Sequence, residues 1–246
     1  MGEYAQKRLI RKLDLERFLT QVQVNPSPKV GLEQYTTSEH IAANMLYLAA
    51  YTNNDIVGKR VLDLGCGTGR LALGAAFLGA ENVVGIDIDK SALGVAIENS
   101  KKTNLTANTQ WINGDISAVQ GRFDTVLQNP PFGVQTRNAD RAFLVKALES
   151  ADMIYSLHNH PEVDKRLISM LKSGTGLLEV QPQAFLKRFV EQHGGVVRAV
   201  YALLMTIPKM FDFHTKEHHD FVIDLYLIQH GTVESLGMKT ARSRES

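Results

Sequence analysis

The first candidate site is a glycine-rich turn with an acidic residue just ahead of it. Residues 61–69 read Val-Leu-Asp-Leu-Gly-Cys-Gly-Thr-Gly, and Gly65, Gly67 and Gly69 allow a sharp turn that a ligand can approach closely. This G-x-G-x-G pattern differs from the G-x-G-x-x-G of pyrophosphate sites. The carboxylate of Asp63 would repel a pyrophosphate and attract an ammonium group. The turn therefore favours S-adenosylmethionine, which carries an ammonium group, over a dinucleotide.

Two further aspartates follow the next strand-like segments. Asp87, followed by Ile88, ends the second segment, where a carboxylate can accept both hydroxyls of a ribose. Asp115 follows the third, and it can accept a hydrogen bond from an adenine amine while Ile116 packs on the ring. Each aspartate alone could be a helix cap or a turn residue. Three of them in register with the glycine turn predict a site for S-adenosylmethionine.

The reacting residues are expected in the segment Asn129, Pro130, Pro131 and Phe132, after the fourth strand-like segment. The adenine amine is a poor nucleophile because its lone pair is delocalised into the ring. The Asn129 side-chain oxygen and the Pro130 carbonyl can accept its two N–H groups and aim the lone pair at a methyl donor. The prolines restrict the backbone, and Phe132 can stack on the base. This chemistry needs no metal ion and no covalent intermediate. The alternative is an ordinary Pro-Pro loop.

The elements that must position these residues alternate between strand and helix, which is typical of a parallel sheet wound by right-handed crossovers. Strands are expected at residues 60–64, 82–86, 110–112, 123–127, 153–157, 196–207 and 221–228, with 177–180 ambiguous. Helices are expected within 3–22 and at 38–50, 71–78, 90–102, 138–151, 162–171 and 182–193. The last two strands should form an antiparallel pair.

Composition is that of an ordinary globular protein: 246 residues, 44% hydrophobic, 22% charged, with a net charge of +1. We expect an N-terminal helical extension and cofactor lid at 1–50, a catalytic domain at 51–230 and a disordered tail at 231–246. Cys66 is the only cysteine, so an internal disulfide is excluded and a reducing, cytoplasmic location is expected. We expect no membrane-spanning segment, because no apolar run is long enough.

These residues together resemble the N6-adenine branch of the class I methyltransferases. The resemblance is greatest to the methyltransferase-like protein 5 family of small-subunit ribosomal RNA adenine methyltransferases, including archaeal relatives. It runs from about residue 7 to residue 228. The segments that carry it are Leu-Glu-Gln-Tyr-Thr-Thr at 32–37, Asp-Leu-Gly-Cys-Gly at 63–67, Asn-Pro-Pro-Phe-Gly at 129–133, Tyr-Ser-Leu-His at 155–158 and Phe-His-Thr-Lys at 213–216.

The resemblance implies a Rossmann-like α/β fold with a seven-stranded, mostly parallel sheet and a final antiparallel hairpin. It implies that Gln34 and Thr37 reach the cofactor from the lid, joining the aspartates and the Gly65-Cys66-Gly67 turn. The substrate adenine would be flipped out and bound by residues 129–132. It also implies a small zinc-binding activator subunit, which could add a strand beside residues 110–112. Trp111 in that segment could equally be a core residue.

Two departures from the family stand near the site, and a third lies further along the chain. Thr36 occupies a position where relatives carry proline, which should loosen the lid slightly. Gln128 precedes the Asn-Pro-Pro-Phe segment where an apolar residue is usual. Residues 169–183 form a longer segment than in the animal members. These departures leave the chemistry intact but open the question of which RNA is the target.

A contact surface for RNA is expected from basic residues in the C-terminal part: Lys187, Arg188, Lys209 and Lys216. The basic helix expected within residues 3–22 could flank the same opening of the catalytic site. The alternative is scattered surface charge, which fits equally well. His214, His218 and His219 could bind a metal, but a solvated or RNA-facing loop is the better interpretation.

Three other functions remain open. A peptide-glutamine N5 methyltransferase uses a related Asn-Pro-Pro motif, although tyrosine is usual where Phe132 stands. A DNA adenine methyltransferase would need a target-recognition domain. A non-catalytic RNA-binding protein that retains the fold is opposed by the intact Asn129 and the three aspartates.

Overall fold

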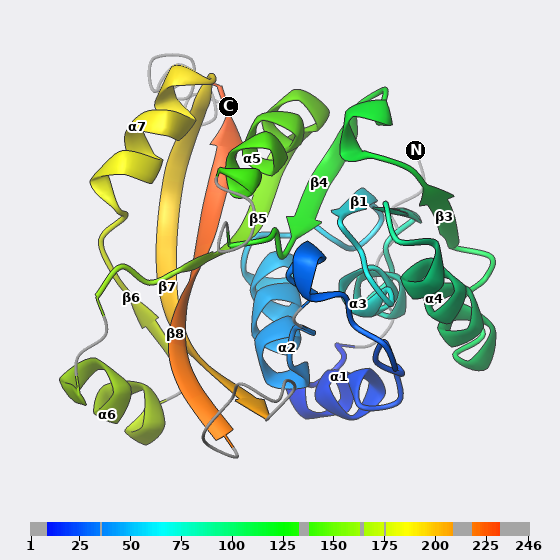
Figure 1. Ribbon diagram of the computed structural model, residues 1–246, viewed down its shortest axis with the longest axis horizontal. Coiled ribbons are helices and arrows are strands. Elements are labelled where there is room, and N and C mark those ends of the chain that lie inside the picture. The colour runs from blue at the N-terminus through cyan, green and yellow to red at the C-terminus, as the bar shows by residue number, and fades with distance from the viewer. Residues whose placement is uncertain are drawn as a thin grey trace.

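The computed structural model describes residues 9–34, 36–132, 138–162, 165–174, 176–208 and 218–231. Its centre is an 8-stranded sheet with the order β3-β2-β1-β4-β5-β8-β7-β6. Strands β1 to β5 pair in parallel, whereas β8 is antiparallel to β5 and β7 is antiparallel to β8. Figure 1 shows β3 at one end of this sheet and β6 at the other.

The seven firmly expected strands are all present, and the predicted fold class is confirmed. Their bounds are β1 Arg60–Leu64, β2 Asn82–Asp87, β3 Thr109–Asn113, β4 Phe123–Gln128, β5 Ala151–Asn159, β7 Gly195–Pro208 and β8 His218–His230. The expected strand number of seven is wrong by one. The ambiguous segment forms β6, Leu177–Glu179, which adds an eighth strand by pairing antiparallel to β7. Three residues, two of them half-buried and one exposed, give too weak a pattern to predict this edge strand.

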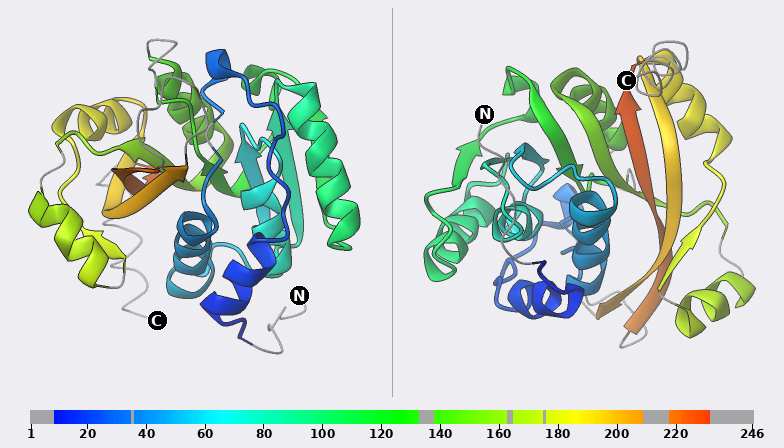
Figure 2. Two further views of the ribbon diagram at one scale, coloured as in Figure 1. Left: turned by 60° about the horizontal axis from the view of Figure 1, so that its bottom comes forward. Right: turned by 180° about the vertical axis from the view of Figure 1, so that it is seen from behind.

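The longer helices are α1 Lys12–Leu19, α2 Glu39–Tyr47, α3 Arg70–Phe77, α4 Lys90–Lys102, α5 Ala139–Ser150, α6 Lys165–Ser173 and α7 Ala184–Gln192. They cover two faces of the sheet because neighbouring strand residues point to opposite sides. In β1, Val61 joins a core with α1, α2 and α3, whereas Leu62 and Leu64 join a core with α5 and α7. Figure 2 shows α4 near the β3 end of the molecule and α6 near the β6 end.

The N-terminal helices are packed into the main core. Leu15 and Leu19 of α1 and Ile41 of α2 are fully buried, in the same cluster as Leu73 of α3. The division of the chain at residue 50 stays a prediction, and residues 232–246 of the expected tail lie outside the described residues. Among the helices that the structure describes, we find none that is both long and apolar enough to cross a membrane.

Trp111 of β3 packs beneath the glycine-rich turn. A Cβ atom on Gly85 would lie 2.7 Å from the indole ring, and one on Gly69 would also collide with it. Gly69 has a φ of +83°, in the left-handed region that favours glycine. The indole is half-buried against the core, so its position supports the interpretation of Trp111 as a core residue. The fold therefore requires glycine at positions 69 and 85, because a side chain at either one would collide with Trp111. Position 69 also requires glycine for the backbone conformation of the turn.

Candidate active site

A large cavity of about 810 Å³ lies at the carboxyl ends of the parallel strands, where ligands bind in sheets of this kind. We call it the main cavity. It is lined by every residue predicted to bind the cofactor: Gln34, Thr37, Asp63, Gly65, Cys66, Gly67, Asp87, Ile88, Asp115 and Ile116. Asn129 and Pro131 also line it. The structure thus brings both halves of the predicted site together, although the role of each residue stays a prediction.

Asp63 is fully buried at the end of β1, beneath the turn. Its Oδ2 accepts a hydrogen bond from the backbone N–H of Ala72 in α3 at 2.9 Å. Burial, together with the nearby charge of Asp87, raises the pKa of Asp63 to about 7. An uncompensated carboxylate in such a place is unfavourable, and a cationic ligand group would stabilise it. Asp63 therefore suits the ammonium group of a methionine moiety.

Asp87 fixes the turn to the second strand. Its Oδ2 accepts from the backbone N–H of Gly67, and its Oδ1 accepts from the backbone N–H of Asp89, both at 2.8 Å. Burial raises the pKa of Asp87. The same burial raises the pKa of the Cys66 thiol well above its usual range, so Cys66 is an inert packing residue. Each carboxylate oxygen of Asp87 keeps a further lone pair for a ribose hydroxyl.

Two isoleucines give the main cavity an apolar slot. Ile88 leaves 58% of its surface exposed, and Ile116 is half-buried. Asp115 beside them accepts from the backbone N–H of Ser117 at 2.8 Å, and hydrogen bonds from Ser117 lower the pKa of Asp115. A flat heterocycle with an amine at its edge fits between apolar walls next to an ionised carboxylate. This arrangement suits the adenine of S-adenosylmethionine.

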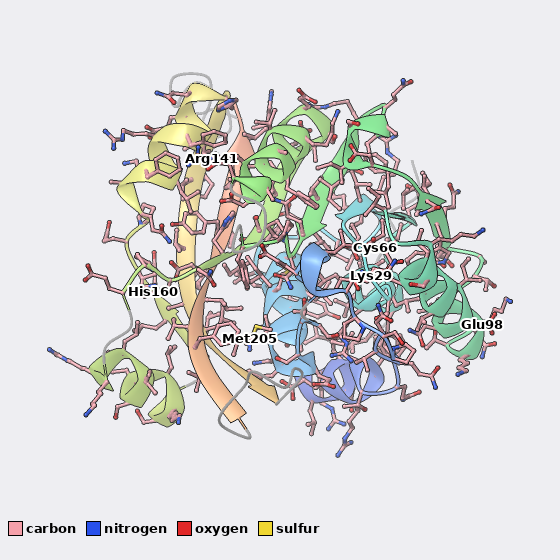
Figure 3. The ribbon with its side chains drawn as sticks, viewed as in Figure 1. Lys29, Cys66, Glu98, Arg141, His160 and Met205 are labelled. Atoms are coloured by element: carbon pink, nitrogen blue, oxygen red, sulfur yellow. The ribbon has the colours of Figure 1, made fainter. Side chains whose placement is uncertain are left out.

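The N-terminal segment is fastened over the main cavity through Asp89. The Lys29 ammonium, labelled in Figure 3, lies 2.7 Å from Asp89 Oδ1, and Gln34 Nε2 donates to Asp89 Oδ2 at 2.8 Å. Burial works against the charge of Asp89, but hydrogen bonds from Lys29, Gln34 and Ser91 outweigh it and keep the pKa well below its usual value. Gln34 also accepts from the backbone N–H of Lys29 at 2.8 Å. The Gln34 amide therefore holds the N-terminal segment, the predicted cofactor lid, in place. Asp89 also caps α4, because its Oδ1 accepts from the backbone N–H of Ser91 at 3.1 Å.

The Asn-Pro-Pro-Phe segment continues directly from the end of β4. Asn129 Nδ2 donates to the Thr37 hydroxyl at 3.0 Å, so the lid contacts the expected catalytic residue as well as the cavity. Pro130 is buried, and Pro131 lines the main cavity. Phe132 points elsewhere, into a second pocket of about 230 Å³. Asn129 and Pro131 thus border the main cavity, whereas Phe132 borders the second pocket.

Arg70 is a residue that sequence reasoning missed. It is buried at the start of α3, where its guanidinium donates to the Thr37 carbonyl at 2.7 Å and to the Val22 carbonyl at 3.1 Å. It therefore ties the lid to the first helix after the glycine turn. A signal was present in the sequence, because an arginine that opens an otherwise apolar helix needs buried partners.

The expected RNA-binding residues are only partly described. Lys187 and Arg188 are exposed on α7, whose Phe185 and Leu186 line the second pocket. Lys209, Lys216 and His214 lie outside the described residues, as do the side chains of His218 and His219. Across the described ranges, no group of three or more His, Cys, Asp or Glu side chains could hold a metal ion.

A mostly parallel sheet that ends in an antiparallel hairpin, with this cavity at its carboxyl edge, defines a class I methyltransferase. A family model described as the methyltransferase small domain matches residues 40–153. The rRNA N(6)-adenosine-methyltransferase Mettl5 of Drosophila melanogaster is 32% identical over 89% of this chain and 96% of its own. The chain belongs to the METTL5 family.

Two further comparisons agree with this assignment. The rRNA N(6)-adenosine-methyltransferase METTL5 of Danio rerio is 43% identical over 59% of this chain and 72% of its own. The crystal structure of PH1948 from Pyrococcus horikoshii, a proposed RNA methyltransferase, superposes with a TM-score of 0.74 at 35% identity and covers 91% of this chain and 100% of that one. The likeness therefore extends over nearly the whole molecule.

Proposed function

We propose that this protein transfers the methyl group of S-adenosylmethionine to N6 of an adenosine in small-subunit ribosomal RNA. The position of the Asn129 side chain supports this proposal most strongly. The Asn129 side chain lies at the wall of the main cavity and is held there by Thr37. The relatives that are named rRNA N(6)-adenosine-methyltransferases support the choice of substrate.

The chain's own groups would act by binding and orientation. S-adenosylmethionine supplies an electrophilic methyl group. Asp63 holds the ammonium end, Asp87 the ribose, and Asp115 with the two isoleucines the adenine. The Asn129 Oδ1 and the Pro130 carbonyl accept the two N–H groups of the substrate amine, which localises its lone pair and directs it toward the methyl group. The amine loses a proton after transfer, and this proton can leave to solvent.

The peptide-glutamine alternative uses the same kind of amide activation, so the Asn-Pro-Pro segment does not exclude it. The relatives named as RNA enzymes favour a nucleobase, and so does the second phenylalanine, Phe185, that borders the same pocket as Phe132. A substrate adenine inside a duplex could not reach Asn129, so the target must be unpaired or extruded. We further propose that Lys187 and Arg188, which are exposed on α7, contact phosphates near the second pocket. A cytoplasmic location stays a prediction.

A zinc-binding activator subunit is the second part of the proposal. Strand β3 is an edge of the sheet and pairs with β2 on one side only. Ile112 on this strand leaves 45% of its surface exposed. An edge strand with an exposed apolar side chain suits a partner that adds a strand of its own. Co-purification with such a subunit, and its loss in Ile112→Lys, would test this part.

The reaction is tested with isotopically labelled S-adenosylmethionine and unmethylated small-subunit ribosomal RNA, with and without an activator subunit. Nucleoside mass spectrometry then identifies the labelled product. Labelled N6-methyladenosine supports the proposal. Label in a Gly-Gly-Gln peptide and none in RNA would move the protein to the glutamine-methylating branch. Cofactor binding without transfer to any substrate, even with the activator, would indicate a retained fold without catalysis.

A further inference from the structure

The second pocket adjoins the main cavity through one shared lining residue, Arg141. It is lined by Phe132, Asp140, Arg141, His158, Asn159, Gln183, Phe185 and Leu186. Arg141, which lies at the start of α5 and is labelled in Figure 3, lines both spaces, and Phe132 follows directly on the residues that line the main cavity. A substrate base whose amine contacts Asn129 can therefore extend its ring toward this second pocket. Its volume of about 230 Å³ is enough for one nucleobase.

An exposed aromatic residue forms one wall of the second pocket. Phe185 at the start of α7 leaves 47% of its surface exposed, and the Arg141 guanidinium lies 4.6 Å from the centre of its ring. Phe132 belongs to a different element and lines the same pocket. Exposed aromatic rings that border one small space are typical of sites that stack a base. The pocket is therefore built for a flat, aromatic guest.

A chain of buried hydrogen bonds runs beneath this pocket. Gln128 Nε2 donates to the Ser156 hydroxyl oxygen at 2.8 Å, and the Ser156 hydroxyl lies 2.8 Å from His158 Nε2. All three side chains are buried, with His158 leaving only 3% of its surface exposed. Gln128 is the residue that departs from the usual apolar type ahead of the Asn-Pro-Pro-Phe segment. Its amide has a specific partner in this fold.

These hydrogen bonds are compatible with a His158 tautomer that keeps a donor at Nδ1. Since the Ser156 oxygen accepts from Gln128, its hydroxyl proton can point to His158 Nε2, which then acts as an acceptor. Burial lowers the pKa of His158 to about 4, so the ring is neutral at physiological pH. A neutral ring with an accepting Nε2 carries its proton on Nδ1. Among the described residues no hydrogen bond occupies Nδ1, and His158 lines the second pocket.

We propose that the second pocket seats the ring of the substrate adenine, with Phe132 and Phe185 as its aromatic walls, and that His158 Nδ1 donates a hydrogen bond to a ring nitrogen of that base. The inference rests on the proposed function and names the residues that recognise the base. Adenine presents only acceptors at N1, N3 and N7, whereas guanine carries a proton at N1. A donor that meets N1 beside the activated amine therefore selects adenine over guanine, whereas N3 and N7 are acceptors in both bases. Gln128 and Ser156 are positioning residues that hold the donor.

The test compares adenosine with 1-deaza-, 3-deaza- and 7-deazaadenosine at the methylated position of a short RNA. Wild-type kcat/KM should fall about tenfold with the one analogue that lacks the accepting nitrogen. His158→Gln places its polar group near Nε2 and removes the donor at Nδ1, so it should lose about tenfold on adenosine and no longer discriminate against that analogue. His158→Asn keeps a donor near Nδ1 and should still discriminate. Because each analogue also alters the amine itself, the ratio between variant and wild type is the measured quantity.

Controls separate folding from recognition. His193→Gln removes an exposed imidazole at the end of α7 and should leave all ratios unchanged. Binding of S-adenosylmethionine to each variant should stay within about twofold of wild type. If the His158 variants do not fold, Phe185→Leu on the surface takes their place and should lower kcat/KM about tenfold by removing a stacking wall.

Each outcome is decisive. Equal analogue ratios in wild type and His158→Gln, or an unchanged kcat/KM in Phe185→Leu, would overturn the assignment of the pocket. Sensitivity to a deaza base beside the target, with none at the target, would also overturn it and give the pocket to a flanking base. A wild-type protein that methylates no adenosine would instead refute the proposed function.

Discussion

The Asn129 side-chain amide donates to the hydroxyl of Thr37, a residue 92 positions earlier in the chain, at 3.0 Å. Because its nitrogen is turned to Thr37, the amide oxygen points away from Thr37. The Thr37 carbonyl is held in turn by the Arg70 guanidinium. The orientation of the expected catalytic amide therefore depends on the N-terminal segment, which the sequence suggested only as a cofactor lid.

Removal of the Thr37 hydroxyl should slow methyl transfer without weakening the binding of the cofactor. Thr37→Val keeps the shape but lets the Asn129 amide rotate, and we expect kcat to fall about tenfold, equivalent to roughly one hydrogen bond. Thr37→Ser keeps the hydroxyl and should retain most activity. Single-turnover methylation and calorimetric titration with S-adenosylhomocysteine measure the two effects. A drop in affinity as large as the drop in rate would show that Thr37 serves mainly the cofactor.

Cofactor binding should strengthen as pH rises through neutrality. In the free protein the pKa of Asp63 is raised to about 7, and a bound ammonium group favours its ionised form and lowers that pKa. At a pH below the pKa of Asp63 in the free protein, the carboxyl must lose its proton before the cofactor binds, which reduces the affinity for the cofactor. Above that pKa the affinity reaches its maximum. Affinity for S-adenosylhomocysteine should be about tenfold weaker near pH 6 than near pH 8.

The matched variant for this pH dependence is Asp63→Asn. An amide oxygen can still accept from Ala72, so the turn should remain intact, but the group no longer titrates. The affinity of Asp63→Asn for S-adenosylhomocysteine should be weaker than that of the wild type at every pH. It should also be nearly independent of pH between 6 and 8. A pH dependence that survives in Asp63→Asn would assign the titration to another group.

Arg70 should matter for stability more than an exposed arginine does. Arg70→Met leaves the carbonyls of Val22 and Thr37 buried without their donor, which should cost roughly 2–4 kcal/mol of the free energy of unfolding. The Arg60 side chain is 57% exposed, and its ion pair with Asp124 is long at 3.9 Å. Arg60→Met should therefore lower the free energy of unfolding by less than about 0.5 kcal/mol. Denaturant titrations compare the two. Equal losses would contradict the role of Arg70 as the tie between lid and core.

Much of the cofactor site could be predicted from sequence because its residues are local to strand ends. Asp63 lies near the end of β1, Asp87 ends β2 and Asp115 follows β3, and parallel strands bring their carboxyl ends to one edge. The Asn129 segment was predicted for the same reason. Strand β6 could not be predicted with certainty, because three residues on a sheet edge give almost no periodic signal.

Contacts between distant segments were the part that sequence could not supply. The Thr37–Asn129 bond, the Arg70 contacts and the Lys29–Asp89 pair each join residues far apart in the chain. Gln128 is the most instructive residue. In the sequence it was only a departure from an apolar position, whereas the fold places Ser156 on the neighbouring strand as its partner.

The basic residues of α7 should contribute to RNA affinity mainly through phosphate contacts. Lys187→Ala with Arg188→Ala should weaken RNA binding across sequences and reduce the slope of log affinity against log salt by about 1.4 to 1.8, which corresponds to two phosphate contacts. Filter binding at several salt concentrations measures this slope. Unchanged slopes would remove α7 from the RNA-contacting surface.

The most direct test of the account measures cofactor affinity and methyl transfer on Asn129→Ala together. In the proposed mechanism the site has a cofactor-binding half and an amine-activating half, and Asn129 belongs to the second. Methyl transfer to adenosine in small-subunit ribosomal RNA should therefore fall by at least about a thousandfold, while the affinity for S-adenosylmethionine stays within about twofold. Loss of cofactor affinity in parallel with activity, or transfer that continues at a near wild-type rate, would contradict this division of the site.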